Sequence, residues 1–186
     1  MGGSSYFKEV LRRYQNNFDL YYDYFLDGKK YPAYGYFFSL GEKYILSKEA
    51  NLWSIKAFEH VLFLEKNTVT VQDLEELFNV MQNQMEPHLV RKGEKYPEKD
   101  HMISYLTIVI IADNTPSVDV IKQIQRFKFD KGYLFNFRGH SEGGIVLSCL
   151  DRKIVYTNRS AKRLKKMFLD VFKYLDKSKA GLTAAC

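Results

Sequence analysis

His101–Asp113, with the sequence HMISYLTIVIIAD, is the stretch that decides the fold of this chain. Apolar residues follow one another almost without interruption between Met102 and Ala112, which is typical of a strand buried on both faces of a sheet. The run has the length of a strand and is too short to cross a membrane as a helix. Because helical patterns flank it on both sides, we predict an interior strand with at least one parallel neighbour.

Segments of helical and strand-like pattern extend outward from this stretch in both directions. Toward the N-terminus we predict a helix over 4–26 that ends at Asp27-Gly28, strands over 31–40, 42–55 and 57–65 with a hairpin turn at Leu40-Gly41-Glu42, and a helix from Thr70 to Pro87. Toward the C-terminus we predict a helix over 116–127 capped by Thr115, strands over 131–138, 143–150 and 153–158, and a helix from Ser160 to Leu175. Thr70 and Asp73 have the spacing of a capping box.

The resulting order α-βββ-α-β-α-βββ-α describes an α+β fold with a mixed, largely antiparallel sheet, because strand triplets joined by short turns pair in antiparallel fashion. A chain of 186 residues is long enough to form one domain with a full core. We therefore expect a single domain over residues 1–179, followed by a flexible C-terminal tail over residues 180–186.

The cysteine content and the N-terminal sequence indicate the compartment. Cys149 and Cys186 are too few and too far apart for a disulfide framework or a metal site, which favours a reducing environment. The N-terminal sequence MGGSSYFKEV has no apolar signal-peptide core, and no apolar run is long enough to span a membrane. We expect a soluble cytoplasmic protein that uses no metal and no cofactor.

Gly139–Gly144, with the sequence GHSEGG, contains the G-x-S-x-G pattern and resembles the nucleophile elbow of the α/β hydrolases. In that family the motif opens a helix, whereas the residues after Ser141 have the pattern of a β-hairpin. The family order also places the catalytic histidine after the serine, and none of the four histidines follows His140. We therefore reject a serine hydrolase and predict that Ser141 is a turn residue.

The order of the first six elements, αβββαβ, resembles that of the restriction-endonuclease-like nucleases. Such a site needs an acid on the second strand and a D/E-x-K triplet on the third, which together hold a metal ion. The third predicted strand offers Glu59-His60-Val61 and Glu65-Lys66-Asn67, neither of which has lysine in third place. Asp27-Gly28-Lys29 and Asp151-Arg152-Lys153 have the spacing but fall in predicted turns. A metal-dependent nuclease with a degenerate site is therefore our alternative hypothesis.

Positive charge is concentrated in the second half of the chain. Residues 1–99 carry 13 Lys+Arg and 14 Asp+Glu, a net charge of −1, whereas residues 100–186 carry 15 and 8, a net charge of +7. In the last predicted helix one face is apolar, and the opposite face carries Arg159, Lys162, Lys166, Lys173 and Lys177. Such a face can bind the phosphates of nucleic acid or an acidic protein, although a solvated lysine face is also usual on surface helices.

Four stretches of the chain, RYQNNFDLYYDYFLDGKKYPAYGYF, HMISYLTIVIIAD, FKFDKGYLFNFRG and VYTNRSAKRLKKMF, resemble small uncharacterised bacterial proteins classed as a domain of unknown function. This resemblance spans most of the chain and implies no activity and no functional residue.

We expect from the residues a non-catalytic binding or interaction domain that uses its basic C-terminal half. The predicted partner is nucleic acid or an acidic protein, contacted through the five basic residues of the last helix, and a homodimer stays open as a further possibility. No residue is predicted to be catalytic, so the sequence favours a binding role over an enzymatic one without deciding between them.

Overall fold

The strand β4, His101–Ala112, lies in the interior of a seven-stranded sheet. The computed structural model describes residues 4–43 and 53–183, and the strand count refers to these ranges. β4 pairs in parallel with β3 (Trp53–Lys66) on one side and with β6 (His140–Cys149) on the other. Every residue from Leu106 to Ala112 is buried. The prediction of an interior strand with a parallel neighbour is confirmed.

The remaining elements follow the predicted order α-βββ-α-β-α-βββ-α. They are α1 (Ser5–Tyr14), β1 (Asp19–Leu26), β2 (Lys29–Lys43), α2 (Val71–Val80), the π-helix η1 (Met81–Val90), α3 (Val118–Arg126), β5 (Asp130–Gly132), β7 (Ile154–Thr157), the short 3-10 helix η2 (Lys162–Leu164) and α4 (Lys165–Thr183). The sheet order is β1-β2-β3-β4-β6-β5, and β7 also pairs with β6. Apart from the two parallel pairs at β4, the strand pairs are antiparallel, which confirms a mixed, largely antiparallel α+β fold.

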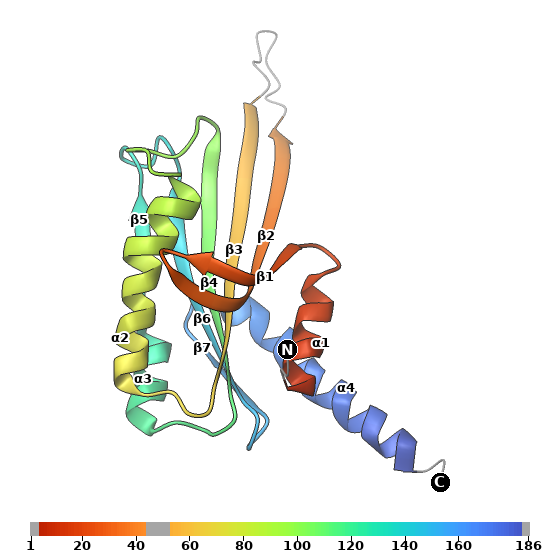
Figure 1. The fold of residues 1–186 in the computed structure, drawn as a ribbon. Helices are drawn as coiled ribbons and strands as arrows, with labels where there is room; N and C mark the ends of the chain where they lie inside the picture. The colour runs from red at the N-terminus through yellow and green to blue at the C-terminus, as the bar shows by residue number, and fades with distance from the viewer. Residues whose placement is uncertain (1–3, 44–52, 184–186) are drawn as a thin grey trace.

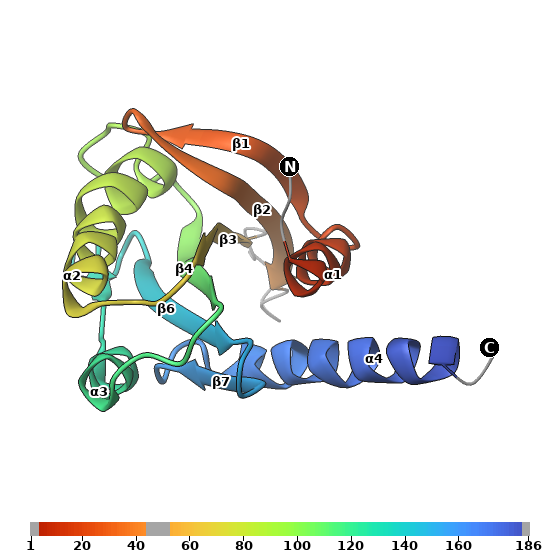
Figure 2. The same cartoon turned by 60° about the horizontal axis from the view of Figure 1, so that its bottom comes forward.

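Helices cover the two faces of the sheet and enclose two apolar layers (Figures 1 and 2). α2, η1 and α3 pack on one face, where the buried side chains include Leu74, Met81, Ile108, Ile124 and Leu147. α1 and α4 pack on the other face, where they include Val10, Phe63, Val109, Phe168 and Val171. Figure 2 shows the β1–β2 hairpin curving over toward the α2–η1 layer.

The N-terminal ends of α2 and α3 test the capping residues that we predicted for these two helices. Thr70 caps α2 by accepting from the Asp73 amide, and the Asp73 carboxylate accepts from the Thr70 amide, so the predicted capping box is confirmed. α3 begins later than predicted, at Val118, because the Ser117 hydroxyl caps it. Thr115 instead donates its hydroxyl to Asp151.

The prediction of a helix over 4–26 is wrong in its second half, since α1 ends at Tyr14 and residues 19–26 form β1. Aromatic residues dominate this segment and favour a strand, although their spacing also continues the helical period. Asp27 and Gly28 have φ of 48° and 76°, and Leu26 pairs with Lys29. The pair is therefore a two-residue hairpin turn and not a helix stop.

The predicted turn at Leu40-Gly41-Glu42 is also wrong, because these residues lie within β2 and pair with β3. The middle strand predicted over 42–55 falls largely outside the described residues, and only its ends belong to β2 and β3. A single glycine at position 41 was therefore not sufficient evidence for a turn, because Gly41 lies within β2 and pairs with Ile55 of β3.

Pro87 does not end the helix that follows Thr70. The chain continues from α2 into η1 as far as Val90, with Pro87 inside it. Proline has no amide proton to donate, and the wider π-helical turn lets the Arg91 amide donate to the Glu86 carbonyl, five residues earlier. The helical layer is longer than predicted for this reason, and it positions Glu86 against the sheet.

The strand predicted over 131–138 is much shorter in the structure. β5 ends at Gly132, and Leu134, Phe135 and Asn136 all have positive φ, and three such residues in a row cannot continue a strand. β6 begins at His140 rather than Gly143, so most of GHSEGG lies in a strand. Within the described ranges, no helix combines the length and apolar character needed to span a bilayer.

Candidate functional site

Ser141 lies in β6 and is fully buried, so the prediction that it occupies a turn is wrong. It pairs with Ser104 of β4 on one side and Lys131 of β5 on the other, which fixes its backbone as strand. Only Gly139, with φ of 72°, keeps the turn conformation that the glycines suggested. The motif therefore forms a strand start and not the sharp strand-to-helix turn of a nucleophile elbow.

A buried hydrogen-bond network holds the Ser141 hydroxyl. Tyr133 donates to the Glu86 carboxylate over 2.9 Å and lies 2.8 Å from Ser141 Oγ. Because a tyrosine hydroxyl has one proton, Ser141 must donate to Tyr133. Burial acts to raise the pKa of Glu86, but hydrogen bonds from Arg91, Lys131 and Tyr133 outweigh it and hold this pKa below its ordinary value. Glu86 is therefore a charged anchor between η1 and the sheet.

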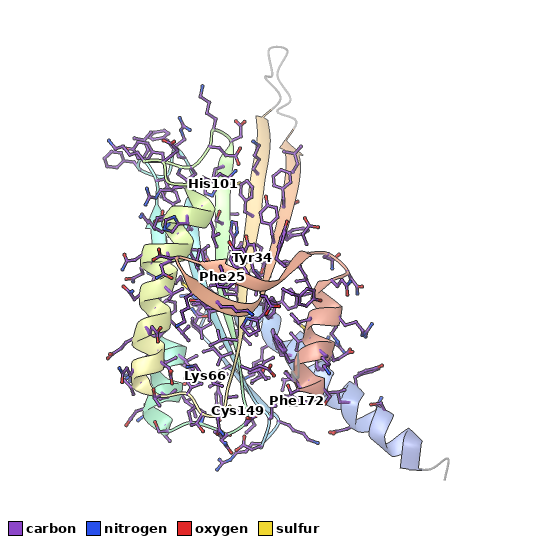
Figure 3. The ribbon with its side chains drawn as sticks, viewed as in Figure 1. Phe25, Tyr34, Lys66, His101, Cys149 and Phe172 are labelled. Carbon is purple, nitrogen blue, oxygen red and sulfur yellow. The ribbon has the colours of Figure 1, made fainter. Side chains whose placement is uncertain are left out.

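The His101 ring packs edge-on against the Tyr133 ring of this network, with centroids 5.7 Å apart, but both of its nitrogens are engaged elsewhere. Its Nδ1 lies 2.8 Å from the carbonyl oxygen of Arg138, so Nδ1 carries the proton and Nε2 accepts from Ser104 over 2.9 Å. Burial lowers the pKa of His101 and keeps the ring neutral. Figure 3 places His101 near one end of the sheet and Cys149 near the other. No imidazole takes part in the hydrogen bonds that the described residues make to Ser141.

We expect a fluorophosphonate probe to leave the folded protein unlabelled. Ser141 and Ser104 are both buried, and the hollow beside Ser104 has a volume of only about 20 Å³, room for about one water molecule. Mass spectrometry of the probe-treated protein measures the outcome. Labelling that disappears in a Ser141→Ala or Ser104→Ala variant would show that one of these serines is an activated nucleophile.

The acidic triplets considered for a nuclease lie apart from one another. Glu59 on β3 pairs with Arg163 over 2.6 Å, and Glu65 near the end of the same strand accepts from the Ser4 amide. Asp27 lies in the β1–β2 turn, and Asp151 accepts from Thr115 after β6. Among the described residues, no three His, Cys, Asp or Glu side chains gather where they could hold a metal ion. The structure therefore adds nothing in favour of the nuclease hypothesis.

The five basic residues predicted to share one helix face fall into two groups. The chain turns through η2 before α4 begins at Lys165, so Arg159 and Lys162 do not belong to that helix. Lys166, Lys173 and Lys177 lie on one face of α4, because their spacings of seven and four residues return to the same side. Lys173 pairs with Asp170 over 3.2 Å. α4 also continues to Thr183, past the predicted end at Leu175, and its C-terminal part projects beyond the sheet (Figure 1).

Arg159 instead lines an open groove of about 680 Å³ on the face of the sheet that α1 and α4 cover in part. The segment between α3 and β5 forms one wall, and the segment between β7 and α4 forms the other. The side chains that line the groove are Tyr105, Gln125, Arg126, Phe127, Lys128, Phe129, Asp130, Glu142, Arg159, Ser160 and Arg163. We call this hollow the basic groove.

Asn158 joins the two walls of the basic groove. Its amide nitrogen donates to the carbonyl oxygens of Phe127 and Gly143, and its Oδ1 accepts from the amides of Ile145 and Ala161. The side chain is buried and uses both its donors and its acceptor in this way. The groove therefore has a fixed shape at its base.

Some of the charged side chains in the basic groove form ion pairs and others do not. Arg163 is committed to Glu59, and its guanidinium lies 4.8 Å from the centre of the Tyr105 ring. His140 lies 3.4 Å from the Glu142 carboxylate. Arg126, Lys128 and Arg159 make no ion pair with any residue that the structure describes. These three side chains can therefore bind an anionic ligand without first breaking an ion pair within the described part of the protein.

Arg126 and Lys128 were absent from the predicted binding residues. They lie in the run QRFKFD at the C-terminal end of α3, where basic and aromatic residues alternate, and this alternation was the available signal. Sequence alone could not place them opposite Arg159, since the two walls are about 30 residues apart in the chain and are joined by tertiary contacts such as the Asn158–Phe127 hydrogen bond.

The sequence of this chain matches one known protein family. The model of one family, described as a domain of unknown function (DUF8052), matches residues 3–170. The chain belongs to this family, which confirms the resemblance to an uncharacterised domain. The searches of curated proteins and of solved structures found no match.

Proposed function

We propose that this domain is a non-catalytic binding module that holds an anionic polymer, nucleic acid above all, in the basic groove. The observation that carries the proposal is that Arg126, Lys128 and Arg159 line one open groove without an ion pair among the described residues. Phosphate contacts supply most of the affinity of sequence-independent nucleic-acid binding.

Aromatic side chains in the groove favour nucleic acid over other polyanions. Tyr105 lies on the floor, and Phe127 and Phe129 alternate with the basic residues of one wall. All three residues are partly exposed, and the Phe127 ring also stacks on Phe78. Proteins that bind single strands combine a basic track with aromatic rings on which bases stack. Asp130 and Glu142 also line the groove and would oppose a phosphate placed directly beside them, which leaves the three unpaired cations to set the path of the chain.

We expect the triple change of Arg126, Lys128 and Arg159 to Gln to weaken binding to labelled single-stranded and duplex DNA at low salt. Removing three phosphate contacts should reduce the slope of log affinity against log salt by up to about 3 for a duplex. Fluorescence polarisation over a salt series measures both quantities. The fold should survive, because Arg126, Lys128 and Arg159 are exposed.

The control is a second triple change, Lys166, Lys173 and Lys177 to Gln, which removes the same charge from the exposed face of α4. It should leave the salt slope near the wild-type value. If this control abolishes binding and the groove variant does not, the helix face binds DNA and the groove proposal is wrong. Binding to polyglutamate with none to DNA would identify an acidic protein as the partner instead.

A further inference from the structure

The loop between β5 and β6 displays apolar side chains directly to solvent. Phe135 is 94% exposed, Phe137 is 85% exposed and Leu134 is 43% exposed. Phenylalanine is ordinarily among the buried residues of a domain, and two such rings left in water in one short loop have a free-energy cost unless something covers them. We call residues 133–139 the aromatic tip.

The backbone of the aromatic tip is a defined structure. Leu134, Phe135 and Asn136 have φ of 49°, 52° and 68°, a left-handed conformation that costs energy for residues other than glycine. Backbone hydrogen bonds close the turn from Phe137 to Leu134, from Arg138 to Tyr133 and from Gly139 to Asn136. A Cβ at Gly139 would collide with the Met102 carbonyl oxygen. The tip therefore maintains a strained conformation that keeps its rings outside.

Buried polar contacts anchor the tip at its base. Tyr133, the first residue of the tip, is buried and bonds to Glu86 and Ser141. At the other end, the Arg138 carbonyl accepts from His101, and the Arg138 guanidinium donates to the Pro97 carbonyl. The tip is thus fixed to η1, to the sheet and to the loop that follows η1.

The surroundings of the aromatic tip have a modest net positive charge. The loop over 91–100 lies at the same end of the molecule as the tip (Figure 1), and the Arg138–Pro97 hydrogen bond joins the two. Together, residues 91–100 and 131–140 contain six Lys or Arg and three Asp or Glu. Arg91 and Lys131 both pair with the buried Glu86, so the two segments and Glu86 together carry six positive and four negative charges, a net charge of +2. The Lys92 side chain is 72% exposed, and Lys95 and Lys99 are exposed in the same loop, where Glu94, Glu98 and Asp100 are also exposed. An apolar point whose surroundings have a net positive charge is complementary to an anionic lipid surface.

We propose that the aromatic tip docks the protein on anionic lipid membranes, with Phe135 and Phe137 entering the boundary between headgroups and acyl chains. The lysines of residues 91–100 then face the headgroups. A projecting tip needs no complementary pocket in a bilayer, whereas a protein partner must supply an apolar hollow. A second copy of this chain offers no such hollow among those we find in the described residues, since each of them carries charged side chains.

The test is cosedimentation with vesicles of phosphatidylcholine alone and of phosphatidylcholine with phosphatidylglycerol in equal parts. We expect the full chain to partition onto the mixed vesicles at low salt and far less onto phosphatidylcholine. The double change Phe135→Ser and Phe137→Ser should lower the partition coefficient by roughly tenfold or more, because both rings lose their burial in lipid. Its unfolding midpoint should match the wild type, since neither ring has a packing role in the fold.

Phe25→Ser is the matched control, because Phe25 is 62% exposed on β1 at a different surface (Figure 3). It should leave partition unchanged. If instead the groove change of Arg126, Lys128 and Arg159 abolishes partition while the double change at the tip does not, the groove binds the vesicles and the tip proposal is wrong. Absence of partition, or equal partition of the double variant, overturns the proposal. A dimer in analytical ultracentrifugation that the double variant abolishes also overturns it, since the tip would then bind a second copy.

Discussion

Replacing Ile108 with alanine should lower the free energy of unfolding by roughly 2–5 kcal/mol. Ile108 is fully buried on β4, directly between Leu62 of β3 and Ile145 of β6. The neighbouring strands hold the site on both sides, so the surrounding atoms cannot collapse fully into the cavity that the change creates. Urea unfolding followed by circular dichroism measures the loss, and Ile110→Ala should behave similarly because Ile110 is equally buried.

Ile154→Ala is the control for this prediction. Ile154 also lies in a strand, β7, but is 36% exposed, so the same deletion should cost well under 1 kcal/mol. Equal losses at Ile108 and Ile154 would contradict the position of β4 inside the sheet.

The central strand and the α2 capping box could be predicted because the signals are local and unambiguous. A nearly continuous apolar run has few solutions other than a buried strand, and Thr70 with Asp73 satisfies two free amide groups at once. Residues 19–26 were harder, since tyrosine and phenylalanine suit a strand yet their spacing also fits a helix. Asp27-Gly28 is a turn signal under either interpretation, so it could not decide between them.

The basic groove could be predicted only in part, because its residues are brought together by a break in the last helix and by tertiary hydrogen bonds. A helical wheel assumes one continuous helix, and the η2 turn before Lys165 separates Arg159 and Lys162 from the lysines of α4. The basic groove depends on Asn158, whose hydrogen bonds cross from one wall to the other. These are tertiary contacts, and they cannot be predicted from the charge count or from the periodicity of the last helix.

Acidification should destabilise the fold between about pH 6.5 and pH 4 through His60. Burial lowers the pKa of His60 to about 4, and the positive charge of Lys92, with that of His101 once its ring is protonated, acts in the same direction. In the unfolded chain a histidine has a pKa of about 6.5, so across this window the unfolded state binds a proton that the folded state excludes. The contribution of neutral His60 is complete above the unfolded pKa and declines as the pH falls, by about 3 kcal/mol in all.

The surroundings of His60 define the variant that tests this prediction. The Tyr34 hydroxyl lies 2.7 Å from Nδ1 of His60. Tyr36, Phe58 and Glu98 line a small hollow beside the His60 ring, and Glu98 is the acidic residue among those that line it. His60→Gln keeps a polar partner for Tyr34 and has no charge to gain. Urea unfolding at a series of pH values should therefore show a flatter profile for this variant, with a residual slope from His101, whose pKa is also lowered by burial.

His88→Gln is the comparison, because His88 is exposed on η1 and should leave the wild-type pH profile unchanged. The imidazole signals of the folded protein give a second, direct measurement, since NMR titration should find His60 uncharged at pH 5. If His60 gains its proton near pH 6.5, or if His60→Gln loses stability with pH as steeply as the wild type, then the folded state tolerates the charge. In that case the close packing of His60 against Tyr34 and Phe58 would have to open in acid, and the acid sensitivity would belong to another group.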